Sequence, residues 1–367
     1  MKINRFTSCA LAIAMSCVWA NTLKAQEYYS FEPVKVADNV YLLKSVKKNG
    51  FWVSGNVIVI INADDVFVVD SGLLPSVGEL AVAEIKKLTN KPVRYLFNTH
   101  WHGDHWQGNI AFALAYPGIE FITTAENYRN ISNFGMLWAR KKYAEVYDGE
   151  ITARQKEYDS GTMRGGGKMP ENIKKYLERT LPGNRKELEE IKKMDLILPS
   201  ITFDKQMTIK SGDREIQLCY LGWGNTTGDG IVYLPKEKIL VSGDLVVYPS
   251  PYESDNFSAE WLATLKKLNA YQYDHLLPGH GPVLNDSAYV NFLIAFFGEI
   301  IKEVNAAVGL DKTPDETKLL VTNKTVMDAV SAGHPEFADF IKRVDPSFVE
   351  QALLRAYPKA HEAKLND

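Results

Sequence analysis

The sequence predicts an α/β fold with a helical insertion and a helical C-terminal extension. Three observations carry this prediction. Short β-branched runs alternate with helical apolar spacing from residue 32 to 123, strand signals resume from 201 to 245, and helical spacing continues from 287 to the end. The 367 residues, 46% of them hydrophobic and 24% charged, are typical of a globular protein with room for one or two domains.

The first elements are a hairpin and a strand–helix–strand unit. β-branched runs predict three strands, at residues 40–43, 56–61 and 66–69. Asp64-Asp65 predicts a turn that pairs the last two strands as a hairpin. Asp70-Ser71-Gly72 ends the third strand, residues 77–88 have the spacing of a helix, and residues 93–97 predict a buried strand.

The densest group of reactive side chains follows that buried strand. Three histidines and one aspartate fall within six consecutive residues: His100, His102, Asp104 and His105. Imidazole and carboxylate are ligands that zinc prefers. His100 and His102 point the same way if the backbone is extended, and Asp104 and His105 are expected to turn into a helix. The spacing therefore predicts a metal site that suits two neighbouring ions better than one, against the alternative of surface or core histidines.

Residues from about 124 to 198 predict a helical insertion. They are rich in Lys, Arg and Glu, with apolar residues at helical spacing. Gly165-Gly166-Gly167 and Leu181-Pro182-Gly183 are expected to divide this region into helices. The mixed charges predict a solvated surface and no patch for polyanions. Because the insertion begins soon after the histidines, it could overhang them as a lid.

Two further hairpins are predicted in the second half. They pair residues 207–209 with 216–221 around Gly212-Asp213, and 231–234 with 239–241 around 235–237. Residues 258–268 predict a helix, and residues 275–277 predict a short final strand. Cys219, in the first hairpin, is expected to be a small buried apolar side chain.

Polar residues with glycines follow three of these strands. They are Gly224-Asn225-Thr226-Thr227-Gly228-Asp229, Ser242-Gly243-Asp244 and Pro278-Gly279-His280-Gly281. Each motif alone is typical of a turn or loop. Because they end successive strands of a chain that also carries the histidine cluster, Asn225, Asp244 and His280 become candidate ligands on one rim.

Together, the run from Thr99 to His105, the Ser-Gly-Asp ending at Asp244 and the Pro-Gly-His-Gly around His280 resemble the motifs of the metallo-β-lactamase superfamily of metal hydrolases. The resemblance covers roughly residues 32 to 285. It implies a four-layer αββα sandwich that holds zinc, one or two ions per chain, with another divalent ion as the alternative. The implied ligands are His100 and His102 for the first ion, Asp104, His105 and His280 for the second, and Asp244 as a bridge between both.

Asn225 departs from the pattern, because the family usually supplies a histidine from this loop. An amide oxygen is neutral and a weaker zinc ligand than imidazole. We therefore expect the first ion to bind less tightly unless water or Asp244 completes its shell. Metal ligand, substrate contact and structural turn residue are three open roles for Asn225.

The expected chemistry follows from the implied ions. A zinc-class ion lowers the pKa of its bound water from 15.7 to about 7, so the nucleophile would be a metal-bound hydroxide. Asp104 would be the catalytic residue that orients it. Asp70 is expected to lie behind the ligands and orient them. Trp101 and Trp106 flank the motif, where they pack in the core or line the substrate cleft.

Asp244 also bears on the substrate. The resemblance implies that members cleaving β-lactams tend to carry cysteine or serine here, whereas members acting on thioesters, lactones or phosphodiesters tend to carry aspartate. We therefore expect a metal-dependent hydrolase whose partner is a small ester, lactone, thioester or amide substrate. A β-lactam hydrolase and a metal-loaded binding or redox-partner protein are the alternatives.

The N-terminus predicts export to the periplasm or the outside of the cell. Residues 1–25 have the basic start, short apolar stretch and small residue at Ala25 of a signal peptide, so the main domain would run from residue 26 to 286. Removing residues 1–25 lowers the net charge from −3 to −6, which disfavours nucleic acid and anionic lipid as partners. No later apolar run is long enough to span a membrane.

Residues 287–367 predict a helical C-terminal extension, with breaks at Gly309, Thr313-Pro314, Gly333 and Pro346. Its first helix is too apolar to be solvated, with Phe292, Ile294, Phe296, Phe297, Ile300 and Ile301. We expect these side chains to pack on the α/β region, on the insertion or on a second subunit, which would make a homo-oligomer.

Overall fold

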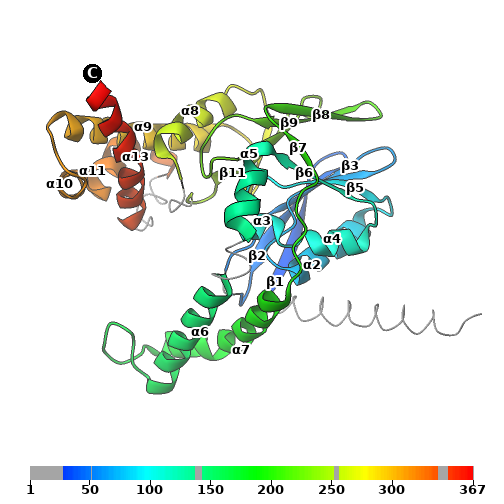
Figure 1. Ribbon diagram of the computed structural model, residues 1–367, viewed down its shortest axis with the longest axis horizontal. Helices are drawn as coiled ribbons and strands as arrows, with labels where there is room; N and C mark the ends of the chain where they lie inside the picture. The colour runs from blue at the N-terminus through cyan, green and yellow to red at the C-terminus, as the bar shows by residue number, and fades with distance from the viewer. Residues whose placement is uncertain (1–27, 51, 137–142, 252–255, 338–345, 367) are drawn as a thin grey trace, which may run out of the picture. The chain divides into compact units, whose positions relative to one another are not determined.

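The computed structural model describes residues 28–50, 52–136, 143–251, 256–337 and 346–366, and the chain divides into two compact units. Unit 1 comprises Met1–Ile122 and Ile131–Ile201, and unit 2 comprises Thr123–Asn130 and Thr202–Asp367. Figure 1 labels most of the helices and strands of both. The predicted signal peptide lies outside the described residues, so its cleavage and the export of the protein stay predictions.

The first sheet has seven strands in chain order, and strands β1 to β5 lie wholly in unit 1: β1 (Tyr29–Ala37), β2 (Val40–Lys47), β3 (Val57–Ile61), β4 (Val66–Val69), β5 (Val93–Phe97), β6 (Glu120–Thr124) and β7 (Ile201–Phe203). The hairpin predicted at Asp64-Asp65 is confirmed, since β3 and β4 pair antiparallel. Strands β4, β5 and β6 run parallel. Their carboxyl ends therefore meet at one edge of the sheet, where Asp70 and the histidine motif follow.

Helix α2 (Pro75–Leu88) connects β4 to β5 and packs on the short helix α4 (Asn109–Ala115). Two glycines allow this close approach. A Cβ at Gly78 would lie 2.6 Å from the carbonyl oxygen of Gly108, and a Cβ at Gly108 would lie 2.1 Å from the carbonyl oxygen of Ser71. The turn after the histidines is thereby held against the end of β4.

The predicted insertion consists of α5 (Ala125–Asn130), a π-helical turn (Ile131–Gly135), α6 (Tyr143–Ser160) and α7 (Glu171–Lys193). Helix α5 belongs to unit 2, and the other three elements belong to unit 1. Helices α6 and α7 pack on each other as a hairpin (Figure 1). The break predicted at Gly165-Gly166-Gly167 is confirmed as the connection between them.

The break predicted at Leu181-Pro182-Gly183 is wrong, because all three residues lie inside α7. A proline inside a helix costs roughly 3 kcal/mol, and tertiary packing outweighs that cost here. Leu177, Leu181 and Leu188 of α7 are buried in the core of unit 1. Gly183 leaves room for an aromatic ring, since a Cβ there would lie 2.0 Å from Cε1 of Tyr28.

Gly108→Ala is expected to lower the free energy of unfolding by about 1–3 kcal/mol, because the added methyl group meets backbone and not a movable side chain. The matched control is Gly149→Ala in α6, where nothing lies within 4 Å of the added carbon. Alanine there should stabilise the protein by about 0.5–1 kcal/mol. Denaturant midpoints of the two variants check this pair, and a Gly108→Ala protein as stable as the wild type would contradict the close approach of Gly108 to the Ser71 carbonyl group after β4.

Unit 2 contains a five-stranded sheet in the order β12 (His275–His280), β11 (Ile239–Val247), β10 (Gly230–Leu234), β9 (Arg214–Tyr220) and β8 (Gln206–Ser211). Both predicted hairpins, β8–β9 and β10–β11, are confirmed as antiparallel pairs. The last pair, β11 and β12, is parallel. Cys219 lies buried in β9, as predicted.

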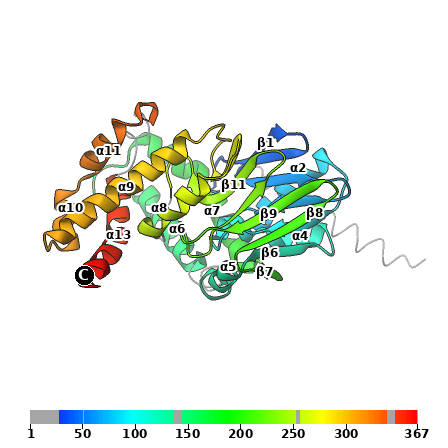
Figure 2. The same cartoon turned by 90° about the horizontal axis from the view of Figure 1, so that it is seen from above.

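The C-terminal extension is helical, as predicted. Its helices are α9 (Ala288–Gly309), α10 (Pro314–Leu320), α11 (Asn323–Ser331), a 3-10 turn (Pro335–Phe337) and α13 (Pro346–Asn366). The apolar face of α9 packs in unit 2, against residues of the sheet and of α8 (Ser258–Leu268) such as Leu240, Leu276 and Trp261. Figure 2 shows α9 running alongside α8, and α9 also packs against α13.

Among the described residues, no helix combines the length and the apolar character needed to cross a membrane.

Candidate metal-binding residues

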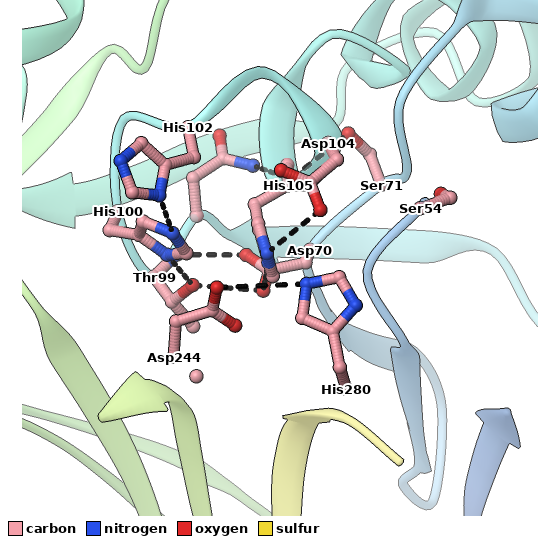
Figure 3. Close-up of polar contacts among 12 residues, drawn as sticks. Ser54, Asp70, Ser71, Thr99, His100, His102, Asp104, His105, Asp244 and His280 are labelled. Carbon is pink, nitrogen blue, oxygen red and sulfur yellow. Dashed lines mark hydrogen bonds and ion pairs between the residues drawn. The ribbon is translucent and has the colours of Figure 1, made fainter. Parts of the chain in front are cut away.

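The histidine motif of unit 1 lies where the sequence places it, directly after β5. His100 is fully buried and His102 is partly exposed in extended backbone at the start of the short helix α3 (Gly103–Trp106). Nε2 of His100 lies 3.0 Å from Nδ1 of His102 (Figure 3). The expectation that these two side chains point the same way is confirmed. Helix α3 then carries Asp104 and His105, as predicted.

Asp70 organises this motif from behind. It follows β4 with a left-handed φ of 61°, and its side chain is buried. Its Oδ1 accepts from the backbone N–H of Thr99 at 2.8 Å, and its Oδ2 accepts from the Thr99 hydroxyl at 2.9 Å. Nδ1 of His105 lies 2.8 Å from the same Oδ2 (Figure 3). Burial raises the pKa of the Asp70 carboxyl, while His105 and Thr99 act in the opposite direction.

These contacts determine which nitrogen of each ring is left for a metal. The Thr99 hydroxyl lies 3.0 Å from Nδ1 of His100, so Nε2 of His100 faces His102. Asp70 holds Nδ1 of His105, and Nε2 of His105 lies 3.4 Å from Oδ2 of Asp104. A carboxylate or hydroxyl on one imidazole nitrogen is the usual way that proteins fix a metal-binding histidine. The motif of unit 1 is therefore oriented as two pairs, His100 with His102 and Asp104 with His105.

The two tryptophans beside the motif differ in environment. Trp106 is fully buried, and its indole N–H donates to the carbonyl oxygen of Trp101 at 2.9 Å. Trp101 is partly exposed, with its ring 4.8 Å from that of His102 and 6.2 Å from that of Phe134. Trp106 thus packs in the core, whereas Trp101 is the one that remains accessible.

Unit 2 brings together the two ligand candidates Asp244 and His280. Asp244 is buried, and its Oδ2 lies 3.6 Å from Nε2 of His280 (Figure 3). The sequence predicted Asp244 beyond the end of a strand, but Asp244 lies inside β11. The pairing of β11 with β12 shifts at Gly243, and the strand continues to Val247. Gly279 makes room for the carboxylate, since a Cβ there would lie 1.9 Å from Oδ1 of Asp244.

Asn225 lies buried in the loop between β9 and β10 of unit 2. The loop is held by its own residues, since the N–H of Thr226 donates to Asp229 at 2.7 Å. It is also held by the segment that includes α5, where Thr124 donates to the carbonyl oxygen of Gly228 at 2.9 Å. The three roles open for Asn225 stay predictions.

The residues of unit 1 fit a divalent metal of the zinc class. Zinc binds imidazole nitrogen at about 2.0–2.1 Å in tetrahedral geometry, so two nitrogens on one ion stand about 3.3 Å apart. Nε2 of His100 and Nδ1 of His102 lie 3.0 Å apart, at hydrogen-bond distance, so a separation of about 0.3 Å would open that spacing. Three imidazoles and one carboxylate are also the donor types that zinc selects over the all-oxygen sets of magnesium and calcium.

Sequence reasoning missed two residues that shape this motif. The Thr99 hydroxyl is hydrogen-bonded to both Asp70 and His100, and its position between strand β5 and the first histidine could have predicted this role. The role of Gly55 could not be predicted from the sequence, because its contacts are with residues far away along the chain. Its N–H donates to the carbonyl oxygen of Asp104 at 3.2 Å, and a Cβ there would lie 2.6 Å from Cε1 of His105.

Comparisons with known proteins agree with the motifs. The family model described as "Metallo-beta-lactamase superfamily" matches residues 50–280 of this chain. Linear primary-alkylsulfatase from Pseudomonas sp. (strain ATCC 19151) is 22% identical over 225 residues, covering 59% of this chain and 40% of that protein. This chain thus spans less than half the length of that relative.

Two solved structures are similar in fold. A metallo-beta-lactamase from Pontibacter korlensis has a TM-score of 0.52 at 18% identity, covering 73% of this chain and 99% of that one. The metallo-beta-lactamase FIM-1 from Pseudomonas aeruginosa has a TM-score of 0.50 at 14% identity, covering 74% of this chain and 97% of that one. At these identities the likeness concerns the fold alone, and it confirms the predicted α/β sandwich.

Proposed function

This chain belongs to the metallo-beta-lactamase superfamily, and from that premise we propose that it is an exported hydrolase that uses one or two zinc ions on a small ester, lactone, thioester or amide. The observation that carries the proposal is the pair of oriented imidazoles, with His100 and His102 nitrogens 3.0 Å apart and Asp70 fixing His105. Since members of the superfamily are hydrolases, the alternative of a metal-loaded binding protein is not carried forward.

The proposed ligands are those that the superfamily motifs imply. His100 and His102 would hold the first ion, Asp104, His105 and His280 the second, and Asp244 would bridge the two. A bound divalent ion would supply a Lewis acid and a water of lowered pKa. Asp104 would orient that water and accept its proton. Asp70 and Thr99 would keep the ring nitrogens deprotonated on the side that faces the ions.

The proposed substrate class follows from Asp244 and from the acidic net charge of the chain, which disfavours nucleic acid. The superfamily resemblance implies that β-lactam-cleaving members tend to carry cysteine or serine at this position, so the aspartate makes a β-lactam the weaker candidate. A sulfate ester is a second candidate, because a relative that is 22% identical over 225 residues is a linear primary-alkylsulfatase. Carboxylic and sulfate esters both present a polarised oxygen beside the bond that breaks, which is what a Lewis acid and an oriented water act on.

The test is a substrate panel run on the purified full chain after zinc loading. It contains a carboxylic ester, a lactone, a thioester, an amide, an alkyl sulfate and a chromogenic cephalosporin. We expect at least one zinc ion per chain by elemental analysis, and turnover of one or more of the first four that stops on chelation and returns with zinc. A folded protein that binds no divalent metal when zinc is supplied in excess would end the proposal. If the cephalosporin or the alkyl sulfate is turned over fastest, the substrate would be reassigned to that class.

A further inference from the structure

The segment from Trp52 to Gly55, between β2 and β3 of unit 1, joins the histidine motif to the helical insertion. Its far end is fixed beside the motif. The N–H of Gly55 donates to the carbonyl oxygen of Asp104 at 3.2 Å, and the hydroxyl of Ser54 accepts from the N–H of Leu73 at 3.1 Å. Ser54 and Gly55 are both buried. This end therefore moves little when the rest of the segment is disturbed.

The near end of the segment has two large apolar side chains in solvent. Trp52 is 38% exposed and Val53 is 53% exposed. Adjacent exposed apolar side chains beside a polar motif are a candidate binding surface. Trp52 and Val53 lie two to three residues before Gly55, whose N–H donates to the carbonyl oxygen of Asp104 and whose Cα faces the His105 ring, so they belong to the segment that borders the candidate ligands of unit 1.

The insertion holds this near end. The Trp52 ring lies 6.2 Å from the ring of Tyr147 at an angle of 46°, which is within the range of favourable aromatic pairs. Tyr147 belongs to α6 and is fully buried. Its hydroxyl donates to the carboxylate of Glu187 on α7, which is also buried. The Tyr29 hydroxyl adds a bond to the carbonyl oxygen of Trp52 at 3.1 Å.

We propose that Tyr147 is a positioning residue, which holds Trp52 and Val53 as an apolar contact for the substrate. The hydrogen bond to Glu187 fixes the Tyr147 ring between α6 and α7, and the ring in turn fixes Trp52. The substrate would then carry an apolar group next to the bond that is hydrolysed. This inference rests on the proposed hydrolase function, and it gives the insertion a role in substrate binding and not in the chemical step.

Tyr147→Ala is expected to raise KM about 3- to 10-fold, the value of one aromatic contact, and to leave kcat and bound zinc within about twofold. Tyr147→Phe, which keeps the ring and loses the bond to Glu187, should shift KM in the same direction by less. The matched controls are Tyr176→Ala and Tyr176→Phe on α7, because Tyr176 is exposed and its ring lies near Arg179. A fall in kcat without a change in KM would overturn the proposal.

A double-mutant cycle separates positioning from general damage. If Tyr147 acts through Trp52, then Tyr147→Ala should add nothing to the KM of Trp52→Ala, whereas independent effects would multiply. Multiplying effects would overturn the proposal. The cycle also works with Tyr147→Phe, should the alanine variant fail to fold.

Hydrogen exchange of the metal-free protein provides a readout that needs no activity. Tyr147→Ala should speed exchange at the backbone amides of Trp52 and Val53, and leave Gly55 protected. Unchanged exchange would overturn the positioning role even in an active enzyme. Faster exchange in a protein that hydrolyses nothing would uphold the positioning role while the proposed function fails.

Discussion

Asp104→Ala is expected to lower kcat/KM by at least about 1,000-fold. Substitution of a group behind a metal ligand already costs roughly 10–100-fold in affinity or activity, and Asp104 is proposed to be both a ligand and the group that orients the attacking water. The side chain is well placed for both, since its Oδ2 lies 3.4 Å from Nε2 of His105 and it is 17% exposed. It can therefore reach an ion and a substrate together.

The measurement is kcat/KM on the best substrate, with bound zinc determined on the same sample. Asp38→Ala is the matched control, because Asp38 is an exposed aspartate that pairs with Lys35 at 2.8 Å away from the motif. Asp38→Ala should change neither quantity. If Asp104→Ala keeps more than a tenth of the activity and its full zinc content, Asp104 is neither ligand nor catalytic residue.

The histidine motif was predictable because its ligands are adjacent in sequence. Strand β5, the extended backbone of His102 and the turn into α3 follow from local rules, and the bounds of β5 and α8 match the predictions. Edge strand β1 was not predicted, because its exposed positions do not alternate with buried ones and leave a weak signal. Local patterns therefore predict most strands of the sheets and the four candidate ligands that are adjacent in sequence.

Features that depend on distant contacts could not be predicted. Pro182 breaks a helix by local rules, yet burial of Leu181 and Leu188 keeps α7 continuous. The bulge that keeps Asp244 inside β11 arises from its pairing with β12, which lies more than thirty residues later. The contact from Tyr147 to Trp52 spans almost a hundred residues. In each case the decisive partner is remote along the chain, so no short window of sequence contains the signal.

Asp70 joins the end of β4 to the histidine motif about thirty residues later in the chain, so its substitution tests how the candidate ligands are oriented. Asp70 directly follows β4, and its carboxylate is hydrogen-bonded to Thr99 and His105 in the segment after β5. A carboxylate accepts hydrogen bonds at both oxygens, whereas an amide accepts at one and donates at the other. An isosteric amide therefore changes the hydrogen bonding of the motif while it keeps the size of the side chain.

Asp70→Asn is expected to weaken zinc binding or activity by about 10- to 100-fold. If the amide oxygen stays on Thr99, its NH₂ group faces Nδ1 of His105, which must then accept and carry its proton on Nε2 instead. That tautomer cannot bind an ion through Nε2. If the amide turns round, its NH₂ group faces the backbone N–H of Thr99, and two donors oppose each other in a buried site.

Zinc affinity measured by competition with a chelator checks this prediction, because it reports on the ligands without a substrate. Asp65→Asn is the matched control, since Asp65 accepts from Asn62 in the β3–β4 turn at 2.7 Å and exchanges the same atoms. It should leave zinc affinity unchanged. Affinity within twofold of the wild type in Asp70→Asn would mean that the tautomer of His105 is set by something other than Asp70. Nε2 of His105 would then not be oriented for metal by Asp70.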